Sequence, residues 1–370
     1  MKKLYAALGV VVVALIIIFF ATRTTHETSA AIRVGAIIPL SGELGYMGEA
    51  IERGMQLALE DNYDVAIELS IQDDKSLDSK GAVNGLNTLL AQGYDDVILD
   101  MAVNTTKSLS PIVESREIPL VVLWDSSNEL LNLSDWVFAM GFSVEAAGED
   151  VATLAYEDFG LRTMGIVNSQ DEWAAEVAHS FQERFEALGG TIVLHEEKPI
   201  GEADFRTQIA KGKNLGAESF YAPIYAPGSS SFFRQARELG YKGPLFTGDV
   251  FSDIDVEALG ELSENIYLAQ LWLDDAEFKH RYEQTYGLKS DPTNLAFAAI
   301  GYDGIKLVAT VYRELRAAGI DNPTNEDVRE HMKTLRFQGI TGLTEFDSEG
   351  RSHKRERLLK VSDGEFLLVR

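Results

Sequence analysis

The stretch 32–62, IRVGAIIPLSGELGYMGEAIERGMQLALEDN, predicts a strand, a glycine-rich turn and an amphipathic helix in one continuous unit. Residues 32–40 form a nearly unbroken apolar run, which is typical of a strand covered on both faces. Ile51, Met55 and Leu59 then recur at helical spacing. Such an order of elements is typical of the first unit of an α/β sheet.

The turn between this strand and helix, SGELGYMG at 41–48, contains three glycines. Glycine lets the backbone turn sharply, so we expect Tyr46 and Met47 at the carboxyl end of the strand. Open α/β sheets bind their ligands at that edge, which makes both residues candidate ligand contacts. A phosphate-binding loop is disfavoured, because the turn has neither GxGxxG nor Gly-Lys-Ser/Thr.

The rest of the chain repeats this pattern in two series. Strand-like runs begin near residues 33, 65, 95, 118 and 136, and again near 163, 191, 218, 245 and 265. Helical patterns separate most neighbouring runs, so each series predicts a mainly parallel sheet with helices on both faces. The break between the series falls near 140–148. A helix capped by Asn294 and a C-terminal hairpin around 362–364 are also expected.

Composition excludes several functional classes. The formal net charge is −25, and such an acidic surface repels nucleic acids and anionic headgroups. A chain without cysteine has no disulfide, no thiolate metal site and no lipid-modified cysteine anchor. The histidines are scattered without metal-ligand spacing and no cofactor loop emerges, so we expect neither a metal nor a cofactor.

The N-terminus directs the chain out of the cytoplasm. Lys2 and Lys3 precede an uncharged apolar run at 4–21, and a small-residue triplet follows at 28–30. One interpretation is a signal peptide cleaved after Ala30. The other is an uncleaved membrane anchor with a short polar tether, which we favour because the run is longer than a usual signal core.

Several motifs appear in the order and spacing of a known family. They are PLSG at 39–42, YMG at 46–48, FFRQARELG at 232–240, AAIGYD at 298–303 and FDSEG at 346–350. In these motifs the chain resembles type I periplasmic binding proteins of the branched-chain amino acid family, over almost everything after residue 30. The resemblance implies two Rossmann-like lobes joined by a three-segment hinge.

The resemblance also implies where the lobes begin and end. Lobe I would comprise 31–143 with 274–343, and lobe II would comprise 144–273 with 344–370. The chain would cross between them at 140–148, 267–275 and 341–347. Residues 1–30 would remain outside both lobes as the signal peptide or anchor.

Residues that follow the predicted strands supply the candidate site. By resemblance, Ser126 and Ser127 would hold the carboxylate of an amino acid through hydroxyls and backbone amides, although ordinary helix capping explains them equally. Asp249 would receive the ammonium group, the alternative being a turn residue after Gly248. Trp173 and Tyr225 would form walls of the site, or else belong to the core.

Two departures from the family pattern leave the ligand open. Val103 stands where leucine, isoleucine and valine binders often carry a serine, with Asn104 beside it, and Met47 replaces an aromatic residue. We therefore add Asn104 to the candidate contacts. An amide, a urea-like compound or a short peptide remains an alternative to an amino acid.

The expected function is an extracytoplasmic solute-binding protein that closes on a small amino-acid-like ligand and delivers it to an ABC permease. The alternative is a membrane-tethered sensing ectodomain or a regulator of an envelope enzyme. No Ser-His-Asp grouping, HExxH or paired-carboxylate signature is present, so we do not expect an enzyme.

Overall fold

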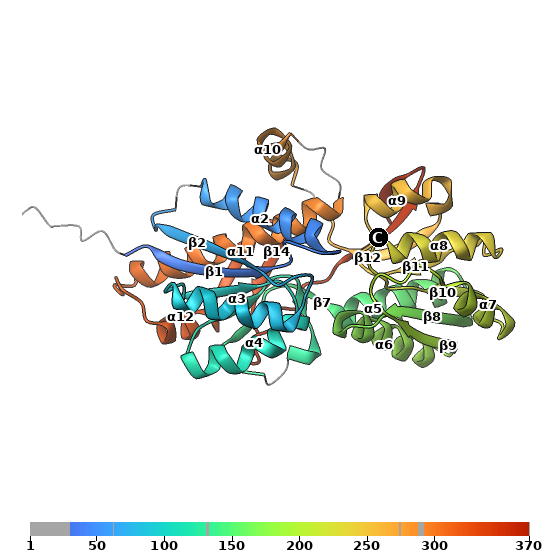
Figure 1. Cartoon of the computed structure of the whole chain (residues 1–370), viewed down its shortest axis with the longest axis horizontal. Coiled ribbons are helices and arrows are strands. Elements are labelled where there is room, and N and C mark those ends of the chain that lie inside the picture. Colours follow the sequence, from blue (N-terminus) through green and yellow to red (C-terminus); the bar gives the residue numbers. More distant parts are fainter. Residues whose placement is uncertain (1–29, 62, 131–132, 274, 288–291, 370) are drawn as a thin grey trace, which may run out of the picture. The chain divides into compact units, whose positions relative to one another are not determined.

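The computed structural model describes residues 30–61, 63–130, 133–273, 275–287 and 292–369. From Ile32 onward the chain forms one compact unit. The predicted signal peptide or anchor at 4–21 lies outside the described residues. Secondary structure in the compact unit follows the two predicted series of strands closely, and two sheets organise it (Figure 1).

The first sheet has five strands in the order β2-β1-β3-β4-β6, and all neighbouring strands are parallel. Its strands are β1 (Ile32–Ile38), β2 (Ile67–Asp73), β3 (Val97–Asp100), β4 (Leu120–Val122) and β6 (Val137–Ala139). Its helices are α2 (Gly45–Leu59), α3 (Ser79–Ala91), α4 (Val103–Arg116), α10 (Ala276–Tyr286), α11 (Pro292–Ala317) and α12 (Asn325–Met332). We call this part of the molecule lobe I.

The second sheet has seven strands in the order β16-β15-β12-β11-β10-β8-β9. They are β8 (Thr163–Ser169), β9 (Thr191–Lys198), β10 (Ser219–Tyr221), β11 (Leu245–Thr247), β12 (Ile266–Gln270), β15 (Arg357–Ser362) and β16 (Glu365–Leu368). Strands β8 to β12 are parallel, whereas β15 and β16 form the predicted antiparallel hairpin at the edge. We call this part lobe II.

Lobe II carries its own helices on both faces of the sheet. They are α5 (Val144–Thr153), α6 (Glu172–Ala187), α7 (Arg206–Asn214), α8 (Gly228–Glu238) and α9 (Asp253–Leu259). Shorter turns are η1 (Asn128–Leu130), η2 (Leu154–Asp158) and η3 (Gly260–Ser263). Two small sheets, β5 (Asp125–Ser126) with β7 (Phe142–Ser143) and β13 (Arg336–Gly339) with β14 (Gly342–Glu345), complete the fold.

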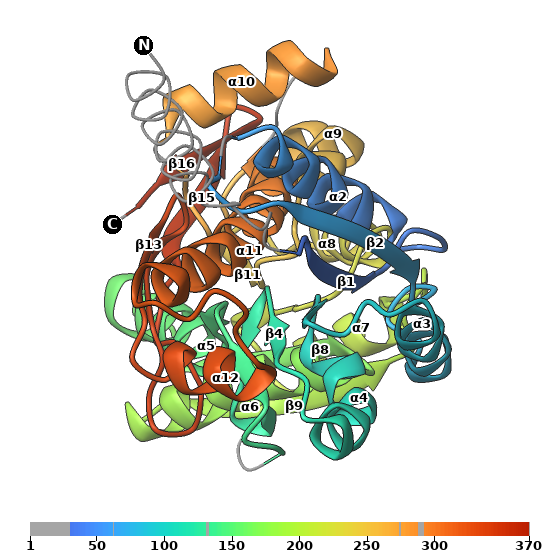
Figure 2. The same cartoon turned by 90° about the vertical axis from the view of Figure 1, so that its left-hand side faces the viewer.

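Alternating side chains of the parallel strands build a core on each face of each sheet. In lobe I, Ile38 of β1 packs with α2 and α11, whereas Ile37 packs with α3 and α4. Figure 2 shows these helices around strands β1 and β2 of the first sheet. Helices α2 and α11 approach closely, since a Cβ on Gly54 would lie 1.8 Å from the carbonyl oxygen of Ala298. In lobe II, α5 and α6 cover one face, and α7, α8 and α9 cover the other.

One buried apolar cluster continues from lobe I into lobe II. It includes Val34 of the first sheet and Ile166 of the second, and it runs through Trp124, Trp173 and Phe297. The apolar side chains between the lobes are therefore packed together in this structure. Whether the boundaries of the lobes fall at the predicted residues stays a prediction.

Two sequence predictions about chain paths need correction. Helix α11 begins at Pro292, so Asn294 lies within its first turn and is not its N-cap. Proline suits that first position because its missing N–H is not needed there. The stretch predicted as the third connection, 341–347, contains strand β14, and segment 346–356 follows it as a turn near 347–350 and an extended stretch; where the third crossing between the lobes falls stays a prediction.

Segment 346–356 runs beside the first connection between the sheets. It forms isolated parallel bridges, Arg351 with Ala139 and Lys354 with Phe142. Ser352 donates its Oγ hydrogen to the carbonyl oxygen of Gly141 at 2.5 Å. Two of the chain connections between the lobes are therefore hydrogen-bonded to each other.

Among the described residues one helix, Thr293–Ala317, is long and apolar enough by composition to cross a membrane. Its most apolar window is 94% buried inside the protein. Since it packs against α2 and the first sheet, we interpret it as the core helix of lobe I.

Candidate ligand-binding site between the lobes

Residues at the carboxyl ends of the parallel strands of both lobes meet around one small cavity. From lobe I come Met47, Leu77, Met101, Ala102, Asn104, Trp124, Asp125 and Phe297, and from lobe II come Trp173, Tyr225 and Val250. This edge is where open α/β sheets bind ligands. The cavity measures about 10 Å³, which leaves room for roughly one water molecule.

Aromatic rings form two walls of the cavity. In lobe I the rings of Trp124 and Phe297 lie 4.4 Å apart between centroids, tilted by 36°. In lobe II the rings of Trp173 and Tyr225 lie 5.1 Å apart, tilted by 50°. Tyr46 packs edge-on against Phe297 at 6.5 Å. Such faces suit an apolar or a cationic group of a ligand.

A hydrogen bond crosses between the lobes at this cavity. The indole Nε1 of Trp124 donates to Oδ2 of Asp249 over 2.7 Å. Both side chains are buried, with 4% and 6% exposure respectively. Asp249 follows strand β11 of lobe II, and Trp124 follows strand β4 of lobe I. The carboxylate predicted to bind an ammonium group is thus engaged by a neutral donor of the opposite lobe.

Asp249 also meets a second carboxyl group, that of Glu356 at the end of segment 346–356. A proton on one of two neighbouring carboxyl groups relieves the repulsion between their negative charges. Burial raises the pKa of Asp249 and of Glu356, and for Glu356 the neighbouring Asp249 adds to this. The pair therefore shares a proton more readily than either group alone.

A further polar contact between the lobes centres on Asp171, the N-cap of α6. Its Oδ1 accepts from the backbone N–H of Ala174 at 3.1 Å, from Tyr225 Oη at 3.4 Å and from Asn104 Nδ2 at 3.5 Å. Burial raises the pKa of Asp171 to about 6, against these hydrogen bonds. Asn104, on α4, thereby links lobe I to the start of α6 in lobe II.

Asp125 is the acidic residue that lines the cavity in the described part of the chain, and its side chain is buried. Its Oδ2 accepts from the backbone N–H of Val103 at 2.8 Å, which satisfies the first turn of α4. Burial raises the pKa of Asp125 well above its usual value, and the carboxylates of Asp249, Glu176 and Asp171 act in the same direction. The cavity is therefore surrounded by acidic groups from both lobes.

Ser126 and Ser127 do not line this cavity. Ser126 donates its Oγ hydrogen to the carbonyl oxygen of Ser352 at 2.5 Å. Ser127 donates to the carboxylate of Glu176 and accepts from the backbone N–H of Glu129 at 2.9 Å, the helix-cap role considered from the sequence. Their predicted contact with a ligand carboxylate stays a prediction.

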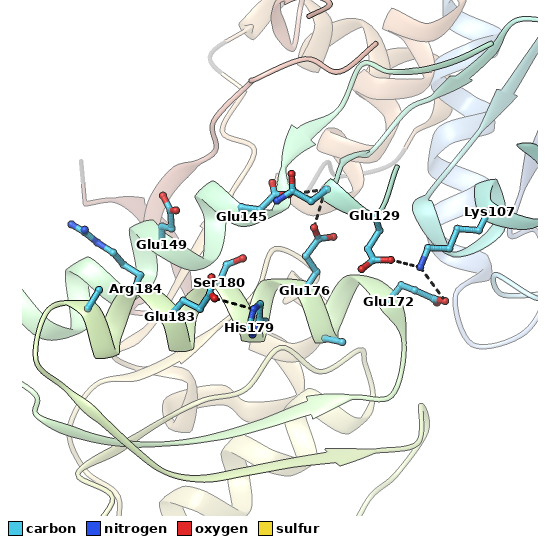
Figure 3. Close-up of a pocket in the computed structure, with 13 residues that line it drawn as sticks. Lys107, Glu129, Glu145, Glu149, Glu172, Glu176, His179, Ser180, Glu183 and Arg184 are labelled. Atoms are coloured by element: carbon cyan, nitrogen blue, oxygen red, sulfur yellow. Dashed lines mark hydrogen bonds and ion pairs between the residues drawn. The ribbon is translucent and has the colours of Figure 1, made fainter. Parts of the chain in front are cut away.

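A larger acidic groove of about 850 Å³ lies beside this contact, between α5 and α6 (Figure 3). Figure 3 shows Glu145 and Glu149 on α5 facing Glu176 and Glu183 on α6. Burial, and the nearby Glu145, raise the pKa of Glu176 to about 8. At one end Lys107 of α4 forms ion pairs with Glu129 at 2.6 Å and Glu172 at 3.7 Å.

Four of the eight predicted site residues line the cavity, namely Met47, Asn104, Trp173 and Tyr225. Asp249 and Tyr46 contact residues that line it. Trp124 and Asp125 directly precede the predicted contacts Ser126 and Ser127 in the sequence, but they were not predicted as contacts themselves. Phe297, Asp171 and Glu356 were not predicted either. A stricter use of the strand-end rule would have found Trp124, Asp125 and Asp171.

Comparison with solved structures confirms the type I periplasmic binding protein fold. The leucine-binding protein LivK of Thermotoga maritima superposes with a TM-score of 0.81 at 22% identity, covering 92% of this chain and 98% of that one. A benzoate-bound solute-binding protein of an ABC transporter from R. palustris gives 0.79 at 20% identity, covering 92% and 96%. The fold is thus that of the two-lobed α/β proteins of this class.

The model of the periplasmic binding protein family matches residues 31–364, so this chain belongs to that family. Among curated proteins, the Leu/Ile/Val-binding protein homolog 6 of Brucella abortus is 22% identical over 348 residues, covering 90% of this chain and 87% of the relative. Family membership implies a location outside the cytoplasm. No group of three or more His, Asp or Glu side chains within the described ranges is arranged to hold a metal ion.

Proposed function

We propose that this protein is an extracytoplasmic solute-binding protein that closes on a small amino-acid-like solute and delivers it to an ABC permease. Family membership over residues 31–364 supports the binding role. The names of similar proteins support the class of solute, since one solved relative is the transporter substrate-binding protein LivJ of Streptococcus pneumoniae in complex with isoleucine. Its TM-score is 0.78 at 23% identity, covering 91% of this chain and 98% of LivJ.

One observation carries this proposal: the hydrogen bond from Trp124 of lobe I to Asp249 of lobe II inside the cavity. A buried carboxylate is best stabilised by a cation that also donates hydrogen bonds. The neutral indole N–H satisfies only one oxygen of Asp249, and Oδ1 has no donor among the described residues. An ammonium group of the solute would take the place of the indole and bind the same carboxylate.

The small size of the cavity implies movement. About 10 Å³ does not hold an amino acid, so either the lobes separate or Trp124 leaves Asp249 before the solute enters. The chain segments at 140–143, 271–273 and 346–356 follow or precede strands of the two sheets and would form part of the hinge. A solute that contacts both lobes would favour the closed form.

A thermal-shift screen of the purified full-length protein against amino acids, amides and amines tests the proposal. A solute bound only by the folded state raises the melting temperature in proportion to RT ln(1 + [L]/Kd). We expect at least one amine-bearing solute to give a saturable shift, confirmed by calorimetry. A screen in which no solute shifts the melting temperature or gives binding heat would contradict the proposed function.

Attachment to the membrane is a separate proposal, because 4–21 lies outside the described residues. We infer that this run stays uncleaved and tethers the binding protein to the outer face of the cytoplasmic membrane. N-terminal sequencing of the mature protein tests it. A sequence that begins at Ala31 would show a cleaved signal peptide instead.

A further inference from the structure

Hydrogen-bond acceptors outnumber donors around the cavity. Three side-chain donors beside it are already engaged: Trp124 Nε1 with Asp249, and both Tyr225 Oη and Asn104 Nδ2 with Asp171. One further buried donor, Tyr221 Oη, has no partner among the described residues, and Asp249 and Glu356 both oppose its ionisation. Five buried acceptor atoms have no donor among the described residues: Asn104 Oδ1, Asp171 Oδ2, Asp249 Oδ1 and both carboxyl oxygens of Glu356. Native proteins rarely leave such atoms unpaired. A solute that fits here must therefore bring N–H groups.

The charges around the cavity also favour a solute with N–H groups. The residues that line the cavity include Asp125 and no lysine or arginine. The closest described bases are engaged elsewhere, since Lys107 pairs with Glu129 and Glu172, and Lys354 donates to Thr341 Oγ1 at 3.0 Å. Among the residues that the structure describes, the lining of the cavity thus offers no basic side chain to bind a carboxylate of a solute.

The acidic groups form two separate poles. One consists of Asp249 with Glu356, and the second consists of Asp171 with the amide oxygen of Asn104. Tyr225 lies close to both, since its hydroxyl contacts Asp171 and its ionisation is opposed by both Asp171 and Asp249. Aromatic side chains line the cavity itself, and aromatic faces attract cations.

The serines predicted to bind a carboxylate are also in acidic surroundings. Ser127 donates to Glu176, and Glu145 accepts from the neighbouring N–H of Asn128 at 2.6 Å. A solute carboxylate at Ser127 would meet both glutamates and be repelled. The structure therefore offers two sites for positive charge and an unfavourable one for negative charge.

We propose that the cavity between the lobes binds a small organic dication, which is a solute with two protonated nitrogen groups and no carboxylate. One nitrogen group is held by Asp249 and Glu356, and the other by Asp171 and Asn104. This inference rests on the proposed solute-binding function, and it replaces the amino-acid-like solute proposed there with a solute that has no carboxylate. It also makes Glu356 a specificity-determining residue, because that side chain adds the second carboxyl group to the Asp249 pole.

Pairs of solutes that differ in one group test the proposal directly. 1,5-Diaminopentane is lysine without its carboxylate, and pentylamine is the same chain with only one amine. We expect calorimetry on the full-length protein to show that the diamine binds at least about tenfold more tightly than either, since an unpaired buried charge is costly. Equal or tighter binding of lysine, or of pentylamine, would overturn the proposal.

Substitution of Glu356 tests the assignment of the first pole. Glu356→Gln keeps the shape of the side chain, and we expect it to weaken diamine binding at least about tenfold. The matched control is Glu257→Gln, the same change at an exposed position of α9, which should leave affinity within about twofold. If Glu356→Gln leaves the diamine affinity unchanged, Glu356 does not contribute to binding of the diamine.

A stability measurement separates loss of binding from loss of folding. Without a solute, a buried carboxyl group next to another is unfavourable, so Glu356→Gln should keep or raise the melting temperature at pH 8. The outcome also separates the two proposals. Leucine or another zwitterion binding in preference to the diamine would overturn the dication and leave the solute-binding function intact, whereas no binding by any member of the panel would overturn both.

Discussion

Among the residues around the cavity, we expect Asp249 to contribute most to the affinity for the solute. Its side chain is buried, touches the opposite lobe through Trp124 and faces the carboxyl group of Glu356. In the proposed complex Asp249 pairs with an ammonium group of the solute, and removing the carboxylate would leave that ammonium group buried without a counter-charge. We expect Asp249→Ala to weaken binding of the identified solute by roughly 2 to 5 kcal/mol.

Calorimetry on the purified variant measures this loss. Ser126→Ala is a useful comparison, because Ser126 lies outside the cavity and donates to Ser352. If Ser126 binds the solute as the sequence predicts, its loss should cost about 0.5 to 1.5 kcal/mol. Unchanged affinity in Asp249→Ala would show that Asp249 does not bind the solute.

Trp124 gives a second prediction at the same scale. Its indole donates to Asp249, so a solute that takes over this carboxylate must move the ring or change its surroundings. We expect binding to change the tryptophan emission, and Trp124→Phe to remove most of that change. Trp136→Phe is the control, because Trp136 contacts Arg329 of α12 and does not line the cavity. A signal that survives in Trp124→Phe would place the movement elsewhere.

Single residues also show where sequence reasoning was sufficient and where it was not. Met47, Trp173 and Tyr225 follow parallel strands, and the strand-end rule predicts them at the cavity. Asn104, which also lines the cavity, was added by comparison with the family pattern. Phe297 lies on the apolar stripe of α11, where periodicity cannot distinguish a cavity wall from core. The roles of all these residues in solute binding stay predictions.

The extended segment 346–356 is the element that the sequence described least well. Its inward-facing residues, Ser352, Lys354 and Glu356, alternate with exposed His353 and Arg355. This is the two-residue period of a strand, with polar side chains where apolar ones are expected. An apolar pattern therefore could not reveal that the segment is buried, or that Glu356 reaches Asp249.

The first connection between the lobes, at 140–143, packs closely against the residues that follow strand β4, which include Trp124. A Cβ on Gly141 would lie 1.8 Å from the carbonyl oxygen of Trp124 and 2.6 Å from the backbone nitrogen of Asp125. We expect Gly141→Ala to push these segments apart and to destabilise the protein by about 1 to 3 kcal/mol or more. Binding should weaken as well, because Trp124 and Asp125 would shift.

Gly243→Ala is the matched control for this element. Gly243 is exposed, and a Cβ there would meet no heavy atom within 4 Å. Chemical denaturation of both variants gives the comparison. Equal stability of Gly141→Ala and the parent protein would mean that the connection adjusts without cost.

At the scale of the whole molecule, buried acidic groups make stability depend on pH. Burial raises the pKa of Asp100 and of Asp74 to about 7, and Asp125, Asp249 and Glu356 shift in the same direction. The folded state therefore binds more protons than the unfolded state between about pH 4 and 7. Stability must fall as pH rises through that window, so we expect a higher melting temperature at pH 5 than at pH 8.

Asp100→Asn should flatten this dependence. Asp100 accepts hydrogen bonds from Thr105 and Thr106, and an asparagine keeps an acceptor without the charge. Asp64→Asn, at an exposed position, is the control and should leave the slope unchanged. Melting temperatures across pH 5 to 8 decide the matter, and stability that rises with pH over this range would contradict the prediction.

The fold as a whole was predictable because the strands are apolar, short and regularly spaced. Strands β8 and β9 begin at Thr163 and Thr191, where the sequence places them. The start of α11 could not be predicted from the sequence, because Asn294 is a good N-cap and Pro292 is an equally good first helical residue. Contacts between the lobes depend on tertiary packing, which local patterns do not encode.

The apolar cluster that passes from one lobe to the other through Trp124, Phe297, Trp173 and Tyr225 has a calorimetric consequence. Separating the lobes would expose these rings to water, and hydration of apolar surface raises heat capacity. A solute that holds the lobes together keeps that surface dry. Its binding enthalpy should therefore become more negative with increasing temperature, even for a solute recognised by charge.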